Sequence, residues 1–214
     1  MRPATHWRPA QGEPTVTALL RHGQTPMSVQ KRYAGRTDAP LTEVGVQQAA
    51  AAAKRLASVG LGVIVTSPLL RTVQTAQAVA AVTGATVVTD DGFRETDFGA
   101  WEGLTFAEVR ERWPAEMSAW LADPEVAPPG GESFTDVSAR VTAALDRVLA
   151  VRTGQTVLIV SHVTPIKMLV AAALLAPPAA LYRMHLDVAA LCEIDWYADG
   201  PAVLRSFNDT SHLS

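Results

Sequence analysis

The sequence predicts an α/β fold, a three-layer αβα sandwich around a mainly parallel central sheet. Short apolar segments alternate with longer helical ones through most of the chain, and this alternation is typical of a parallel sheet covered by helices on both faces. Within the apolar segments, apolar and polar residues do not strictly alternate, which indicates strands buried on both sides. Several segments end in polar residues, at the positions where ligands bind in open α/β sheets.

The first elements follow from local signals. Residues 16–20 form the first expected strand, because they are apolar and lie between turn residues. Residues 26–40 have no clear periodicity and are expected to be a loop. Thr42 is a suitable N-cap for the alanine-rich helix expected at residues 46–57, since its hydroxyl can accept a hydrogen bond from a free backbone N–H.

The rest of the chain continues the alternation. Further strands are expected at residues 63–66, 85–89 and 156–160. Helices are expected at residues 70–82, 106–113, 115–121, 134–151 and 166–175. Along the longest helix Val137, Val141, Leu145 and Val148 recur on one face, which is the pattern of a helix packed on a core. Residues 191–196 and 203–207 are expected to complete the sheet as edge strands.

The composition excludes several classes of protein. The chain has 214 residues, of which 48% are hydrophobic and 18% charged, enough for one sizeable folded domain. The net charge of −3 argues against a nucleic-acid surface. The longest apolar stretch, residues 168–181, is broken by Pro177-Pro178 and is too short to cross a bilayer. We therefore expect no nucleic-acid or membrane partner.

The two ends of the chain and its cysteine content complete this outline. Residues 1–14 are polar and proline-rich, with no secretion signal, and are expected to be a linker or flexible N-terminal tail before a single domain at residues 15–214. Cys192 is the single cysteine, so no disulfide can form within the chain. These features favour a cytoplasmic protein.

Polar residues that could carry chemistry follow three of the expected strands. They are Arg21, His22, Ser67, Arg71, Ser161 and His162. Because the carboxyl ends of parallel strands lie at one edge of a sheet, we expect these side chains to meet there. Glu95, which follows the third strand, is expected to join them. Gly23, beside a histidine, is expected to let a ligand approach the backbone closely.

Two arginines, two histidines and a glutamate suit phosphate esters better than other substrates. Guanidinium groups match phosphate oxygens in geometry and charge, and helix N-termini near Pro68 and Thr164 would add N–H donors. Phosphoryl transfer requires above all positioning and the neutralisation of charge. A histidine can accept the phosphoryl group, and a glutamic acid can protonate the leaving oxygen.

These residues also carry a resemblance to the histidine phosphatase superfamily, whose fold is phosphoglycerate mutase-like. The matching motifs are Arg21-His22-Gly23 with Thr25, Arg71 in SPLLRTVQTA, Glu95 in FRETDFGAWEGLT and His162 in VSH. The RHG element alone is a weak signal, but the four pieces in this order are specific. The resemblance covers residues 16–207.

The resemblance implies a role for each matching residue. It makes His22 the phosphoryl acceptor and Glu95 the proton donor, with Arg21, Arg71 and His162 around the phosphate. It also implies that no metal or other cofactor is needed. Because an unperturbed glutamate titrates near ~4.3 and the donor must be protonated, we expect an acidic pH optimum.

Thr25, Ser28 and Val163 are the remaining expected phosphate contacts. Ser28 departs from the family pattern, which often has asparagine there, and its shorter side chain puts one phosphate contact in question. Val163 stands where the family frequently has glycine, but its backbone N–H can still point at phosphate. A metal site at His22 and His162 is the disfavoured alternative, because two nearby arginines would repel a cation.

The segments DFGAWEGLTFAEV and PPGGESF are similar to those of phosphatases, including the α-ribazole phosphatase group. The chain also resembles the phosphatase half of actinobacterial fusions with ribonuclease H, in which residues 1–14 would be an interdomain linker. The expected function is hydrolysis of a small phosphate monoester, an α-ribazole-phosphate-like molecule being one option. A phosphoglycerate-type mutase and a non-catalytic module that binds a phosphorylated ligand are the alternatives.

Several other residues have a simpler interpretation. Trp113, Met117 and Trp120 fall at helical spacing, so a packing face is favoured over an aromatic lid. The loop arginines Arg32, Arg36 and Arg94 are expected to be solvated charges. Residues 130–133 are expected to form a turn and a helix N-cap. Cys192 lacks the arginine six residues later that a cysteine phosphatase needs, and His6, His185 and His212 are treated as surface or packing residues.

Overall fold

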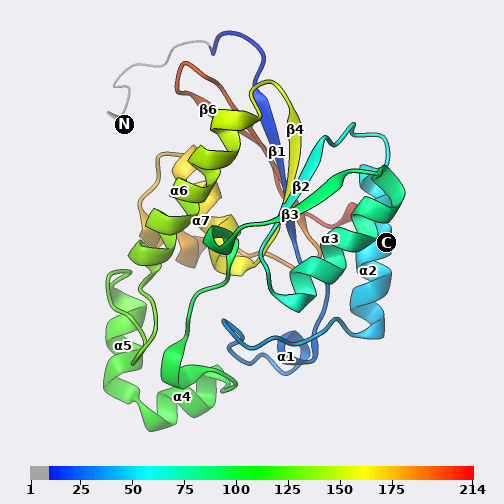
Figure 1. Ribbon diagram of the computed structural model, residues 1–214. Coiled ribbons are helices and arrows are strands. Elements are labelled where there is room, and N and C mark those ends of the chain that lie inside the picture. The colour runs from blue at the N-terminus through cyan, green and yellow to red at the C-terminus, as the bar shows by residue number, and fades with distance from the viewer. Residues whose placement is uncertain (1–9) are drawn as a thin grey trace.

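The structure, a computed structural model, describes residues 10–214 and has a six-stranded sheet as its middle layer (Figure 1). Its strands are β1 (Thr15–Arg21), β2 (Val63–Thr66), β3 (Thr86–Thr89), β4 (Thr156–Ser161), β5 (Leu191–Trp196) and β6 (Ala202–Asp209). Their order in the sheet is β3-β2-β4-β1-β5-β6. Strands β1 to β4 run parallel, which confirms the mainly parallel sheet.

The prediction of two C-terminal edge strands is wrong for β5. This strand pairs antiparallel with β1 on one side and with β6 on the other, so it lies inside the sheet. The edges are β3 and β6. Because β5 returns beside β1 instead of extending the sheet from its end, β1 has a neighbour on each side and lies inside the sheet.

The helices cover both faces of the sheet, as the αβα prediction requires. The α-helices are α1 (Pro26–Val29), α2 (Glu43–Leu56), α3 (Leu70–Thr83), α4 (Phe106–Arg112), α5 (Pro114–Ala122), α6 (Phe134–Val151) and α7 (Val163–Ala173), and short 3-10 helices occur at Asp91–Phe93, Gly99–Trp101, Pro178–Arg183 and Ser211–Leu213. Helices α2 and α3 lie on one face, and α6 and α7 on the other (Figure 1).

Successive strand residues bury their side chains on opposite faces. Leu19 and Ile159 belong to the core under α6 and α7, whereas Leu20, Leu158 and Val160 belong to the core under α2 and α3. A strand covered on both faces needs apolar residues at every position. This requirement explains the continuous apolar segments of the sequence and fixes the sheet as a rigid base for the residues at its edge.

The expected loop at residues 26–40 begins instead with the short helix α1. Thr25 caps this helix, because its hydroxyl accepts a hydrogen bond from Ser28 N at 3.2 Å while Ser28 Oγ accepts one from Thr25 N at 2.9 Å. Pro26 occupies the first helical position, where its missing N–H has no cost. A helix of one turn has no apolar period, so periodicity could not predict it.

The aromatic residues between α4 and α6 form core. Met117 and Trp120 are buried, and the Trp120 ring meets Trp101 and Phe134 with centroid separations of 5.4 and 4.9 Å. Trp113 packs at the border of the same cluster. The packing interpretation is therefore confirmed, and these side chains are part of the fold rather than a lid.

Two further sequence-based expectations concern the N-terminal tail and the presence of a membrane-spanning segment. Most of the predicted tail, including His6 and Trp7, lies outside the described residues, and residues 10–14 have no helix or strand, so the linker stays a prediction. No helix within residues 10–214 has both the length and the apolar character that crossing a membrane requires.

The packing role of Trp120 can be tested by its truncation. We expect Trp120→Ala to lower the free energy of unfolding by about 3–5 kcal/mol, because a large buried ring leaves a cavity. Leu121→Ala, at the next position with a side chain that is 43% exposed, should change it by less than about 0.5 kcal/mol. Urea denaturation measures both, and equal effects would contradict the assignment of Trp120 to the core.

Candidate active site

The predicted site residues come together at the carboxyl ends of β1, β2 and β4. The imidazole rings of His22 and His162 have centroids 5.2 Å apart. Arg71, in the first turn of α3, donates a hydrogen bond from Nε to His162 Nδ1 at 3.2 Å. Glu95 accepts hydrogen bonds from the N–H groups of Val163 and Thr164 at 3.1 and 3.2 Å. Four segments far apart in the sequence thus meet at one edge of the sheet.

His22 is held in a single tautomer. Its Nδ1 lies 2.8 Å from the carbonyl oxygen of Gly23, and a carbonyl can only accept, so Nδ1 carries the proton and Nε2 keeps its lone pair. Burial lowers the pKa of His22 well below 6.5, and the charges of Arg21 and Arg71 lower it further. The ring is therefore neutral near neutral pH, with Nε2 as a potential nucleophile.

His162 is a neutral link between two polar groups. Its Nδ1 accepts from Arg71, so the ring must carry its proton on Nε2, which lies 2.8 Å from Ser67 Oγ and donates to it. Burial, followed by the charge of Arg71, lowers the pKa of His162 well below 6.5. Because both ring nitrogens are engaged within the protein, the expected contact of His162 with phosphate stays a prediction.

The two arginines have different partners, and Arg71 is buried whereas Arg21 is half-buried. The guanidinium of Arg71, which is 1% exposed, donates to Thr37 O at 2.7 Å and to Ala34 O at 2.8 Å. Arg21 donates from Nη1 to Leu186 O at 2.6 Å, while its buried Nε has no hydrogen-bond partner among residues 10–214. Burial lowers the pKa of Arg21 to about 10, so both side chains remain positive at neutral pH.

Ser28 and Val163, two of the expected phosphate contacts, are engaged elsewhere in this structure. Ser28 Oγ accepts from Thr25 N and donates to Thr25 O at 2.8 Å, so it serves the cap of α1. The Val163 N–H donates to Glu95 Oε2. Their contacts with a phosphate, and that of Thr25, stay predictions.

Gly23 lies in close contact with the backbone of helix α2. A Cβ on Gly23 would collide with the carbonyl oxygen of Gly45 in α2, and a Cβ on Gly45 would collide with the carbonyl oxygen of Gln24. The two backbones touch, so both residues must lack a side chain. The close approach of a ligand to Gly23 stays a prediction.

Ser67 joins the site as strand polarity predicts, because it stands directly after β2, the same position relative to its strand that His22 and His162 occupy, and its Oγ lies 2.8 Å from His162 Nε2. Glu102 is a residue that sequence reasoning left out of the site, and its position in the sequence gives no such signal. Its carboxylate accepts hydrogen bonds from the N–H groups of Gly35 and Arg36, each at 2.9 Å, and so orders the loop whose carbonyl groups bind Arg71.

The loop arginines pair with carboxylates at 2.6–3.0 Å, as Arg32–Glu108, Arg36–Asp97 and Arg94–Asp91. Arg36 is exposed, as expected of a solvated charge, whereas Arg32 and Arg94 are half-buried. Ser133 caps α6. Burial raises the pKa of the Cys192 thiol to about 11, so it is uncharged at neutral pH. Within residues 10–214, no three His, Cys, Asp or Glu side chains are grouped as metal ligands would be.

Both the sequence and the fold of this chain match those of known proteins. The profile of the histidine phosphatase superfamily (branch 1) matches residues 17–210. The chain belongs to this family. Bifunctional protein Rv2228c of Mycobacterium tuberculosis is 51% identical over 208 residues, which make up 97% of this chain but 57% of that protein. The chain thus spans a little over half the length of this mycobacterial relative.

Other members of the histidine phosphatase superfamily match over nearly their whole length. Probable phosphoglycerate mutase GpmB of Yersinia pestis is 36% identical, covering 91% of this chain and 93% of that protein. The solved structure of mycobacterial glucosyl-3-phosphoglycerate phosphatase Rv2419c with VO3 has a TM-score of 0.84 and 33% identity, over 92% of this chain and 100% of that one. A putative α-ribazole-5′-P phosphatase of Escherichia coli has a TM-score of 0.84 and 27% identity, over 92% and 97%. The superfamily members found are thus phosphatases and a probable mutase.

The buried neutral histidines make stability depend on pH. Their pKa values in the folded state lie below 6.5, so the unfolded chain binds more protons as the pH falls through about 6.5. Each histidine should then lower the free energy of unfolding by on the order of 1 kcal/mol per pH unit. We expect the pair to remove about 2 kcal/mol between pH 7 and 5.5.

Urea denaturation at the two pH values measures this loss. In His22→Asn the part of this loss that comes from the two buried histidines should shrink by about half, because one of the two groups no longer titrates. The comparison with the wild type cancels the contributions of all other groups. An identical loss in the two proteins would contradict the buried neutral state of His22.

Proposed function

We propose that this member of the histidine phosphatase superfamily hydrolyses a small phosphate monoester, with His22 as the nucleophile. The observation that carries the proposal is the fixed tautomer of His22, whose Nδ1–H is bound to Gly23 O so that Nε2 holds the lone pair. Two guanidinium groups near this ring supply the positive charge that a phosphate requires. The combination suits attack on phosphorus better than proton transfer or metal binding.

In the first step the lone pair of His22 Nε2 attacks phosphorus, and the bond between phosphorus and the ester oxygen breaks. The leaving oxygen takes a proton from the carboxyl group of Glu95, and an alcohol departs. The products are phospho-His22 and the Glu95 carboxylate. Arg21 and Arg71 stabilise the charge on the equatorial oxygens, which is the principal requirement of phosphoryl transfer.

In the second step the Glu95 carboxylate accepts a proton from a water molecule whose oxygen attacks the phosphorus. The bond between nitrogen and phosphorus breaks, inorganic phosphate leaves, and His22 and protonated Glu95 are restored. Glu95 is suited to both steps because its position is fixed by the N–H groups at the start of α7. The two steps need no metal or other cofactor.

A phosphoglycerate-type mutase is the second candidate, because one relative carries the name of a probable phosphoglycerate mutase. The phosphatase is favoured because solved structures similar over more than nine-tenths of the chain are named as phosphatases. The substrates in those names, glucosyl-3-phosphoglycerate and α-ribazole-5′-phosphate, define a first panel of esters to test. A mutase would transfer phosphate between positions of one molecule, whereas a phosphatase releases it.

The chain is proposed to be one part of a longer protein, because the relative of which it covers 57% is named as bifunctional. The ribonuclease H domain suggested by the sequence, the absence of a nucleic-acid partner for this domain and the cytoplasmic location remain parts of this proposal. They do not affect the chemistry of the site.

The nucleophile is tested by His22→Asn. We expect loss of phosphate release from p-nitrophenyl phosphate, and loss of the acid-labile phosphoenzyme that the wild type forms with a radiolabelled ester. Circular dichroism provides the control for folding. Retained turnover in the variant would remove His22 from the mechanism, label exchange within phosphoglycerate without phosphate release would favour the mutase, and activity abolished by a chelator would favour a metal.

The pH dependence of kcat/KM tests the proton donor. Because the pKa of His22 lies well below 6.5, the nucleophile stays neutral and active in mildly acidic solution. An acid that protonates the leaving oxygen works only while it holds its proton, so the rate should fall as the pH rises. We expect kcat/KM to decline from acidic toward basic pH in the wild type and to lose this decline in Glu95→Gln, and a rate that climbs above neutrality would contradict the role of Glu95.

A further inference from the structure

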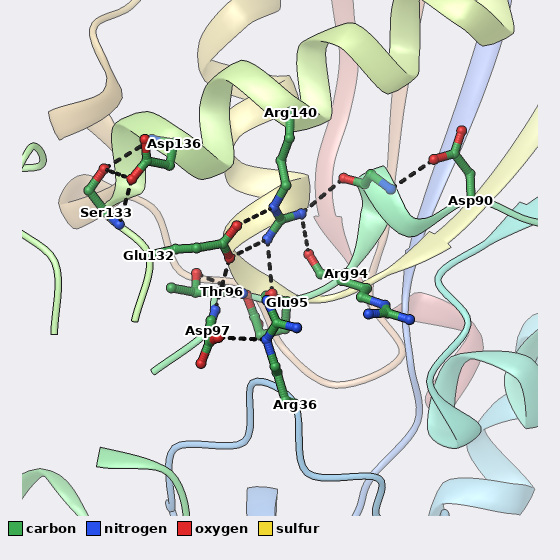
Figure 2. Close-up of polar contacts among 11 residues, drawn as sticks. Arg36, Asp90, Arg94, Glu95, Thr96, Asp97, Glu132, Ser133, Asp136 and Arg140 are labelled. Atoms are coloured by element: carbon green, nitrogen blue, oxygen red, sulfur yellow. Dashed lines mark hydrogen bonds and ion pairs between the residues drawn. The ribbon is translucent and has the colours of Figure 1, made fainter. Parts of the chain in front are cut away.

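A side chain outside the predicted site, Arg140 of α6, makes five hydrogen bonds to the segment that carries Glu95 and to Glu132 (Figure 2). A guanidinium has five N–H donors in a rigid plane. Each of those five donors has an acceptor here. The acceptors are three backbone carbonyl groups and the carboxylate of Glu132. Such complete use fixes the orientation of the group and of everything bonded to it.

Three of the acceptors are backbone carbonyl groups that lead up to and include Glu95. Arg140 Nη1 donates to Gly92 O at 3.0 Å and to Arg94 O at 2.7 Å, and Nη2 donates to Glu95 O at 2.9 Å. One planar cation therefore sets the path of the chain from the 3-10 helix Asp91–Phe93 to the proton donor. The carbonyl of Glu95 itself is the last point of this path.

Glu132 extends the same support to the other side of Glu95. Its carboxylate takes two hydrogen bonds from Arg140, at 2.9 and 3.0 Å, and Oε2 also accepts from Asp97 N at 3.0 Å. Glu132 N donates to Asp97 O at 2.9 Å. The backbone is thus fixed at Glu95 and again at Asp97, two residues later. The point from which the Glu95 side chain extends is therefore fixed as well.

The turn that presents Glu132 is itself held against this segment. A Cβ on Gly131 would collide with the carbonyl oxygen of Asp97, and Ala100 N donates to Pro129 O at 2.9 Å. Arg140 and Glu132 are each 23% exposed, so water competes little for their hydrogen bonds. Arg140 and Glu132 are thus held in place by the fold, next to the backbone of Glu95.

We propose that Arg140 and Glu132 are positioning residues for Glu95, which place its carboxyl group for proton transfer to the leaving oxygen. This inference rests on the proposed function of Glu95 as the acid. Loss of this positioning should slow the reaction of some substrates and not of others. A displaced acid slows the expulsion of leaving groups that need a proton, and it has little effect on leaving groups that depart as stable anions.

The test compares two substrates in the variant Arg140→Lys, which keeps the positive charge but loses the five-donor plane. Glycerol 2-phosphate releases an alkoxide that needs a proton, whereas 2,4-dinitrophenyl phosphate releases a stable phenolate. We expect kcat/KM to fall about 10- to 100-fold for the first, within the contribution of general acid catalysis, and to change little for the second. An equal fall for both substrates would overturn the proposal, because a purely structural role gives that result.

Arg147→Lys is the matched control on the same helix. Arg147 donates to Asp90 at 2.8 and 2.9 Å and to Ala143 O, in place of the carbonyl groups around Glu95. We expect it to leave the ratio of the two kcat/KM values unchanged. A shift as large as that of Arg140→Lys would show a general response of α6 and would overturn the proposal.

Glu95→Gln separates the two levels of inference. If Glu95→Gln leaves the ratio of the two kcat/KM values at the wild-type value, the proposed function of Glu95 fails. If it lowers the kcat/KM for glycerol 2-phosphate relative to that for 2,4-dinitrophenyl phosphate and Arg140→Lys does not, only the positioning role fails. In the double variant, Arg140→Lys should add no further change to the ratio, because both substitutions act through the same proton. Should Arg140→Lys fail to fold, Glu132→Gln, which removes the charge of the partner and replaces one of its two acceptor oxygens with an NH2 group, provides the same comparison.

Discussion

The buried guanidinium of Arg71 is the constraint on which the site depends. A cation that is 1% exposed has left water, so its N–H groups must find acceptors within the protein. They find His162 Nδ1 and carbonyl groups of residues 34–37. Helix α3, the strand end that bears His162 and a distant loop are therefore joined at one planar group. The same charge helps to keep His22 and His162 neutral, so the cation sets both the shape and the protonation of the site.

Charged side chains order the loops around this centre largely through hydrogen bonds to backbone groups. Glu102 accepts hydrogen bonds from N–H groups of the loop that binds Arg71. Arg140 donates hydrogen bonds to carbonyl groups at Glu95 and just before it. A loop has few hydrogen bonds of its own, and a single multivalent side chain supplies several at once. The loops at this edge of the sheet are thus ordered by charged residues that lie outside the predicted site.

Sequence reasoning could find the residues whose place follows from strand polarity. Arg21 ends β1, His22 and His162 stand directly after β1 and β4, and the parallel sheet brings such positions to one edge. The inner place of β5 could not be found, because antiparallel pairing with β1 leaves no mark in the composition of that strand. Arg140 was missed for a similar reason. A lone arginine on the polar side of a helix has the same pattern whether it faces solvent or binds carbonyl groups 45 residues away in sequence, as Arg140 does at Glu95.

The contact between the backbones of Gly23 and Gly45 limits how such a site can diversify. Neither residue has room for a methyl group, so a side chain at either position would have to push helix α2 away from the end of β1. Diversification within such a fold must therefore take place in other segments around the site, with the backbone that supports His22 left as it is.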